Sequence, residues 1–220
     1  MKLPLLVLTS AALLASANAY SSNFNYNYLD LGYGTTNYDL KYGGLNESID
    51  SADGIAVKGS VAISPNFNLV GAYSKGSTTH TFDIGAPLVE IKGKLEAERF
   101  ELGVGAHRAV GPRTDMFGEV KYVETDYTTK SVTINGVDAF FFSDDDQEGG
   151  GYGLDLGLRH KFNSRFEGLA SVGYEDVDNR NQASATVGGL MNINQRMAVG
   201  VNLTKGEEDE SASAGLRINF

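Results

Sequence analysis

Alternation of apolar and polar side chains is the feature that most limits what this chain can fold into. In residues 55–63, with the sequence IAVKGSVAI, apolar residues or glycine take the odd positions and small or polar residues take the even ones. The same period of two recurs at 67–73, 100–104, 152–158 and 166–174. An amphipathic helix needs apolar residues at spacings of three and four, which these segments lack. The pattern therefore predicts an all-β protein.

The connections between the alternating segments fall into two classes. We expect ten strands, at residues 24–36, 53–63, 67–75, 94–107, 115–125, 150–161, 165–176, 183–193, 197–204 and 211–220. Tight polar turns such as 64–66 join alternate pairs, whereas the loops near 37–52, 76–93 and 126–149 are long. An even strand number with short turns on one side and long loops on the other is typical of a transmembrane antiparallel up-and-down β-barrel of the outer membrane. A secreted β-sandwich would also alternate, and eight strands remain an alternative to ten if two shorter runs form loop hairpins.

The N-terminal residues have the composition of an export signal. Leu3–Ala15 is an apolar run of secretory length, and Ala17-Asn18-Ala19 is a small-x-small cleavage pattern. We therefore expect residues 1–19 to be a cleaved signal peptide and 20–220 to form a single barrel domain. No later segment has eighteen uninterrupted apolar residues. Insertion into a membrane would therefore have to use strands.

Composition excludes several classes of function. The chain has no cysteine, which excludes disulfides, cysteine nucleophiles and thiolate metal sites. A formal net charge of −10 argues against nucleic acid as a partner, because phosphate binding needs clustered Lys and Arg. The acidic loop runs lack the ligand spacing of a calcium site, and His80, His107 and His160 form no recognisable set with a nucleophile. We expect no enzymatic activity, no cofactor and no metal.

Aromatic residues on the apolar face gather at the two ends of the expected strands. The set near the long loops is Tyr33, Tyr73, Tyr122, Tyr152 and Tyr174, and the set at the opposite ends is Phe67, Phe166 and Phe220. Two aromatic girdles around an aliphatic band are what membrane interfaces select, because amphipathic rings sit at headgroup depth. A soluble sandwich has no reason to sort its tyrosines by end. This distribution favours the barrel.

The C-terminal segment Leu216-Arg217-Ile218-Asn219-Phe220 resembles the last strand of Gram-negative outer-membrane barrels, which typically ends in Phe. The first expected strand, with the sequence YNYLDLGY at 26–33, is similar to the opening strand of small OmpA- and OmpX-like barrels. Residues 53–67 look like a small subfamily once discussed as secreted signals or immune elicitors. The resemblance implies integral localisation in the cell outer membrane, contact with its lipid and lipopolysaccharide, and recognition by the outer-membrane assembly machinery.

The face opposite the aliphatic one would line the lumen, and it is charged. Its charged residues are Asp30, Lys58, Arg99, Glu101, Glu119, Lys121, Asp155, Arg159, Glu167, Glu175 and Arg217. Charges facing lipid would cost a few kcal/mol each, so they must point inward. Glycines such as Gly103 on the same face leave room for long side chains, and a charge placed at Gly103 should be better tolerated than one placed at Leu102 or Leu156. Two interpretations remain: a ladder of paired charges that fills the lumen, or a narrow path for ions or small polar solutes.

The loop near 126–149 contains one defined turn signal. Asn135-Gly136 between apolar residues is typical of a type I′ hairpin, so two strands would continue beyond the membrane. Phe140, Phe141 and Phe142 form an apolar cluster that could bind a surface partner, whose identity is unknown, or pack on the barrel rim. The sequence thus predicts a non-enzymatic barrel with a role in envelope structure and narrow, porin-like passage. The alternative is a surface binding or adhesion platform that uses its long loops.

Overall fold

The computed structural model describes residues 23–38, 41–42, 45–46, 49–84, 89–138, 146–178, 180–207 and 209–220. The signal peptide expected at 1–19 and the Phe140–Phe142 cluster lie outside the described residues. No helix among the described residues is long and apolar enough to cross a membrane.

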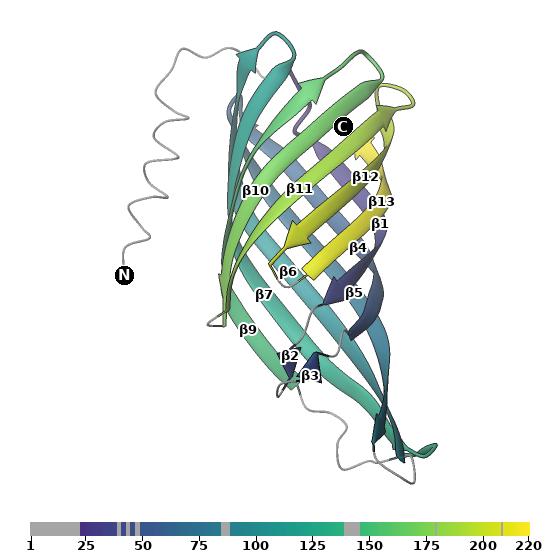
Figure 1. Cartoon of the computed structure of the whole chain (residues 1–220). Helices are drawn as coiled ribbons and strands as arrows, with labels where there is room; N and C mark the ends of the chain where they lie inside the picture. The colour runs from purple at the N-terminus through teal and green to yellow at the C-terminus, as the bar shows by residue number, and fades with distance from the viewer. Residues whose placement is uncertain are drawn as a thin grey trace.

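Ten strands form one closed antiparallel barrel, which confirms the expected fold and strand number (Figure 1). They are β1 (Tyr28–Tyr38), β4 (Ile49–Ser64), β5 (Phe67–Ile84), β6 (Val89–Gly111), β7 (Thr114–Ile134), β9 (Asp146–Lys161), β10 (Phe166–Val177), β11 (Arg180–Asn192), β12 (Met197–Gly206) and β13 (Asp209–Asn219). Each strand pairs with its neighbours in chain order, and β1 pairs with β13 to close the ring. Three two-residue strands stand apart from the ring: β8 (Val137–Asp138) pairs with β7, and β2 (Lys41–Tyr42) pairs with β3 (Leu45–Asn46).

The two ends of the barrel differ. At one end, which we call the short-turn end, connections of two to four residues join the strand pairs β4–β5, β6–β7, β9–β10 and β11–β12. At the other, long-strand end, β5, β6 and β7 reach well beyond β10–β13, as the lower part of Figure 1 shows. The turn at Asn135-Gly136 has φ angles of 50° and 78°, the left-handed values that a type I′ hairpin requires. The hairpin expected from this dipeptide is therefore confirmed.

The strands are longer than the sequence pattern predicts at this end. Residues 76–84 and 89–93 were expected in a loop, but they belong to β5 and β6, whereas residues 126–134 continue β7 as the hairpin signal predicts. These segments are rich in threonine, and the β-branched residues threonine, isoleucine and valine favour extended backbone. They lose the apolar alternation because both of their faces lie outside an apolar environment. The alternation therefore marks the limit of the apolar band and not the end of the strand.

The barrel is apolar outside and polar inside. Leu102, Leu158 and Val172 point outward, with exposed fractions of 56, 48 and 61%. Asn68, Asp115 and many other polar side chains are buried within the ring. A water-soluble sandwich would bury the first set and expose the second. This inversion fits a barrel whose outer face contacts lipid.

Candidate functional site

All eleven charged residues expected on the lumen face take part in ion pairs. Arg99, Glu101, Lys121, Asp155 and Glu175 form one connected network, with N···O distances of 2.5–2.9 Å. Three separate pairs complete the set: Lys58–Glu119 at 3.2 Å, Arg159–Glu167 at 3.1 Å and Arg217–Asp30 at 2.7 Å. We call these eleven residues the charge ladder. All of them except Glu175 line the lumen cavity.

Two of these contacts cross the lumen. Arg99 on β6 reaches Glu175 on β10, and Lys58 on β4 reaches Glu119 on β7, although neither pair of strands is adjacent. Gly103 faces the ladder and makes room for it, because a Cβ added there would lie 2.9 Å from Lys121 Cγ. The ladder therefore ties opposite parts of the wall together, which long side chains can do only where the facing residues are small.

A segment that the sequence pattern assigns to the first strand occupies the short-turn end. Residues 23–27, which we call the strap, precede β1 and lie in the mouth of the barrel. Phe24 and Tyr26 are buried, and the guanidinium carbon of Arg159 lies 4.5 Å and 5.1 Å from the centres of their rings. The expectation that 24–27 are strand is wrong. Their alternate aromatic residues continue the inward parity of β1 and fill the mouth.

Asp115 fastens the strap to the barrel wall. Its side chain is fully buried (0% exposed), and its carboxylate accepts hydrogen bonds from the backbone and side-chain nitrogens of Asn23 at 3.2 Å and 3.0 Å. The Tyr26 hydroxyl lies 3.5 Å from its other oxygen. The ring of His107 stacks on the ring of Tyr26 at 3.5 Å between centres. These contacts hold the strap in one position.

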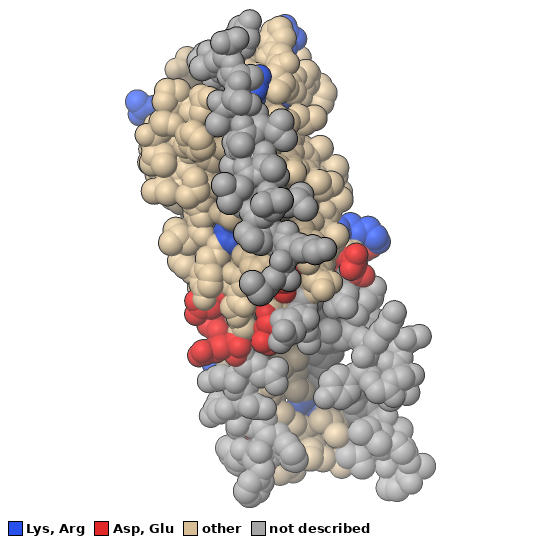
Figure 2. Space-filling view, turned by 90° about the vertical axis from the view of Figure 1, so that its left-hand side faces the viewer, with Lys and Arg blue, Asp and Glu red and all other residues tan. Residues whose placement is uncertain are grey.

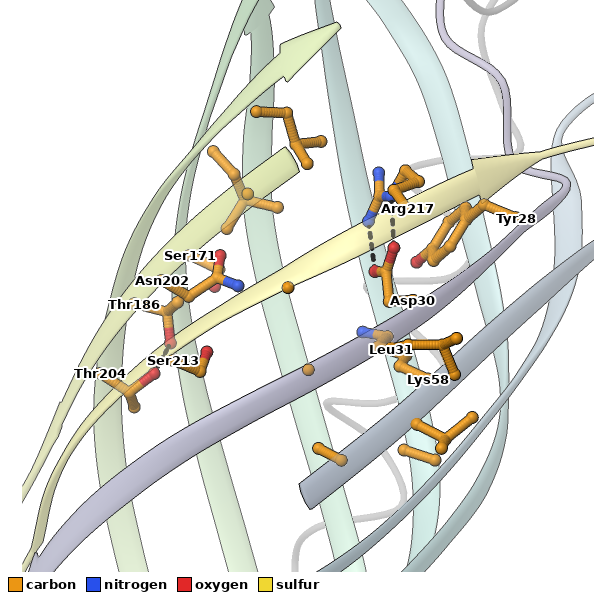
Figure 3. Close-up of a pocket in the computed structure, with 18 of the residues that line it drawn as sticks. Tyr28, Asp30, Leu31, Lys58, Ser171, Thr186, Asn202, Thr204, Ser213 and Arg217 are labelled. Atoms are coloured by element: carbon orange, nitrogen blue, oxygen red, sulfur yellow. Dashed lines mark hydrogen bonds and ion pairs between the residues drawn. The ribbon is translucent and has the colours of Figure 1, made fainter. Parts of the chain in front are cut away.

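A cavity of about 470 Å³ remains in the lumen beside the ladder. Tyr26, Phe117 and Arg159 line it near the short-turn end, so the strap forms its floor. On one side it is lined by ladder residues, including Arg99 and Lys121. On the other side lie hydroxyl and amide side chains of β10–β13, seen together on the left of Figure 3. The ladder therefore narrows the lumen without filling it, and Tyr26 of the strap lines one end of the remaining space.

The tyrosines of one expected girdle point outward and are anchored by acids. Tyr73, Tyr122 and Tyr152 donate hydrogen bonds to Glu98, Glu124 and Asp176 at 2.9, 3.2 and 2.9 Å. Figure 2 shows acidic side chains gathered between the upper part of the face in view, whose visible charged side chains are Lys or Arg, and the long-strand end. Because carboxylates do not lie in hydrocarbon, these contacts mark the boundary of the apolar band. Phe67, Phe166 and Phe220 are also exposed on the outer face, at the short-turn end.

On the long-strand side of this boundary, Lys75 forms ion pairs with two acidic residues on the outer face. Its ammonium lies 3.2 Å from Glu96 and 2.7 Å from Glu98. The hydrogen bonds from Lys75 lower the pKa of both carboxyl groups below the usual value. Because the pKa of these carboxyl groups is lower in the folded state than in the unfolded state, their ionisation stabilises the fold at pH values above the unfolded-state pKa. This stabilisation is lost as the pH falls through the folded-state pKa.

We therefore expect acid to destabilise the pairing of β5 and β6 at the long-strand end. Amide exchange near Glu96 and Glu98, corrected for its intrinsic pH dependence, should become faster below about pH 4. Exchange near Leu102 should keep its protection. In the variant Lys75→Met, the acid-dependent difference between the two regions should disappear. If exchange near Glu96 and Glu98 were as sensitive to acid in the variant as in the unaltered protein, this assignment would be contradicted.

Two of the three histidines make contacts at the short-turn end. His107 packs against Tyr26, and His160 Nδ1 lies 2.9 Å from the Thr114 hydroxyl, both near the short-turn end. The side chain of His80 lies outside the described residues. Among the residues that the structure describes, no group of three His, Asp or Glu side chains is placed to hold a metal ion.

Solved structures share this architecture. The NanC porin superposes with a TM-score of 0.50 at 9% identity, with 87% of this chain and all of that chain covered. Ail of Yersinia pestis, determined with a heparin analogue, gives 0.43 at 13% identity over 87% and 99%. The protease OmpT from Escherichia coli gives 0.47 at 13% identity over 92% and 99%. At these identities the likeness concerns the fold alone.

No curated protein sequence matches the chain significantly. A family comparison does: residues 5–190 match the outer membrane protein beta-barrel domain, which covers most of the chain. That match agrees with the apolar outer face, the closed ring of ten strands and the paired charges inside it. The chain therefore belongs to the outer membrane protein beta-barrel family, and its place is the outer membrane.

Proposed function

We propose that the protein is a non-enzymatic, non-conducting barrel that contributes to envelope structure. The observation that carries this proposal is the position of the strap inside the short-turn end, with Asp115, His107 and Arg159 packed around it. By the usual orientation of such barrels, this end faces the periplasm and the long-strand end faces outward. The lumen would then be closed toward the periplasm and open toward the outside of the cell.

The surroundings of the barrel are part of the proposal. The two girdles would contact outer-membrane lipid and lipopolysaccharide, since their rings point outward at both ends of the apolar band. Residues 1–19 would be removed on export. The exposed terminal Phe220 would be available to the outer-membrane assembly machinery during insertion.

Swelling of protein-containing liposomes in a glucose solution tests the closed lumen. The account predicts swelling no faster than that of liposomes without protein. A known general porin, reconstituted in the same lipid, provides the positive control. Faster swelling that depends on the amount of this protein would contradict a non-conducting barrel and favour narrow passage of small solutes.

A second candidate function, a surface binding platform, is favoured by the unequal height of the wall. β6 has 23 residues and β12 has 10. The paired β6 and β7 continue from Leu102↔Tyr122 at the girdle to Ile91↔Ile134. The eleven steps along β6 and the twelve along β7 correspond to about 40 Å of strand. The wall ends in the β7–β8 hairpin, where Val137 is 70% exposed.

Deletion of residues 132–142 tests the platform. Cells that produce the protein should adhere to extracellular-matrix proteins, and the deletion should abolish adhesion while the barrel still folds. Heat-dependent migration on gels, which reports a folded barrel, provides the control. Adhesion that survives the deletion would remove the platform from consideration.

A further inference from the structure

We propose that the lumen cavity is a binding site for an uncharged polyhydroxylated ligand, a mono- or disaccharide, that enters from the long-strand end. The inference deepens the proposed function and rests on it for the direction of entry. The cavity volume of about 470 Å³ lies within the range of small-molecule sites. The strap closes one end of this space, so a ligand that enters it would be held and not passed on.

The charge state of the cavity argues against an ionic ligand. Every charged side chain that lines the cavity belongs to the charge ladder, and each has an ion partner at 2.5–3.2 Å. An anion or a cation would have to break one of these pairs before it gained a partner of its own. Breaking such a buried pair costs more free energy than a new ion pair with the ligand would gain.

Hydrogen-bonding groups without charge occupy the opposite side. Ser171, Thr186, Asn202, Thr204 and Ser213 come from the four strands β10–β13 and lie together in Figure 3; we call them the polar wall. Thr186 and Thr204 hydroxyls are 2.9 Å apart. Within the described part of the chain, the side chains of Ser171, Asn202 and Ser213 make no hydrogen bond to protein, so their donors and acceptors are available.

Asn202 is the central member of this wall. It pairs with Gly188, and a Cβ added at Gly188 would lie 2.2 Å from Asn202 Oδ1. The absent side chain at Gly188 therefore gives the amide its position over the neighbouring strand. Leu169 and Leu190 line the same side of the cavity. Hydroxyl and amide groups beside aliphatic carbons match a sugar, which presents hydroxyls at its edge and C–H groups on its face.

Calorimetric titration of the detergent-solubilised protein, purified from outer membranes, tests the proposal. The uncharged probes are glucose, maltose and sucrose, and the charged matches of glucose are glucuronate and glucosamine. We expect saturable binding of at least one uncharged sugar, and affinity at least about tenfold lower for both charged sugars than for glucose or maltose. Absence of saturable heat with all three uncharged sugars would overturn the proposal. Equal affinity for glucuronate or glucosamine would also overturn it.

Variants locate the binding. Asn202→Leu should lower the affinity for the bound sugar by about tenfold, because it removes both polar atoms. Leu203→Val, on the lipid side of the same strand, should leave it unchanged. Ser213→Ala is a milder second test if Asn202→Leu does not fold, and it should also weaken binding. Unchanged affinity in the folded lumen variants would refute the site.

The two proposals fail separately. If the protein makes liposomes swell in glucose but still binds the sugar through Asn202, the proposal of a closed lumen is wrong and the binding site stands. If liposomes with the protein do not swell and no sugar binds, the closed barrel stands and the binding site is wrong.

Discussion

Replacement of Lys121 by methionine is expected to lower the free energy of unfolding by about 3 kcal/mol. The Lys121 ammonium lies 2.8 Å from Glu101 and 2.9 Å from Asp155, and its side chain is 10% exposed. Methionine fills most of the same volume, so the loss would come from two carboxylates left without this cation. Equilibrium unfolding by urea in lipid vesicles measures the difference.

Lys130→Met provides the matched control. Lys130 lies 3.9 Å from Glu96 and is 45% exposed, so its pair should contribute less than about 1 kcal/mol. The double variant Lys121→Met, Asp155→Asn should recover part of the lost stability, since it removes the carboxylate whose ion pair is made with Lys121, whereas Glu101 keeps its pair with Arg99. Equal effects of the two methionine variants would contradict the ladder as a structural element.

Replacement of Leu158 by arginine is expected to destabilise the barrel by about 2–4 kcal/mol. Leu158 is 48% exposed on the outer face and pairs with Ala170, midway between Phe166 and Tyr174. An arginine there would lie near the centre of the apolar band. The same unfolding measurement applies, with Ser171→Arg as the control because Ser171 faces the lumen cavity. A similar loss in both variants would contradict the assignment of lipid and lumen faces.

Gly103 shows where strand parity stops being informative. Its position on the lumen face predicts that a charge is better tolerated there than at Leu102. The space at this position is small, because a Cβ at Gly103 would lie 2.2 Å from the Val120 carbonyl oxygen and 2.9 Å from Lys121 Cγ. The period of two determines which face a residue occupies. It carries no information about the space left by the neighbouring strand.

The ring of ten strands and the ladder could be predicted because both depend on the same alternation. Asp30 and Arg217, for example, are 187 residues apart, yet their parity alone places both on the lumen face. Their pairing also needed the register between β1 and β13, which the sequence does not provide.

The strap was missed because the pattern YNYLDLGY continues upstream as Asn23-Phe24-Asn25, with unchanged alternation. Nothing in the sequence marks the point where pairing with a neighbouring strand ends. The signal that could have found it is chemical. Phe24 and Tyr26 are large aromatic residues with the inward parity of charged Asp30, so they had to meet a partner inside the barrel, and Arg159 is that partner. Asp115 was missed for a related reason, because an acid at the end of a strand looks like part of a turn.

Single-channel recording in a planar bilayer tests the central claim, closure of the lumen by the strap. For the protein purified from outer membranes, the account predicts no discrete openings. The double variant Phe24→Ala, Tyr26→Ala should show them, because it removes both rings from the mouth while the ladder remains. Phe67→Ala, on the outer face at the same end, should stay silent. Discrete openings in the unaltered protein, or silence in a folded double variant, would contradict the account.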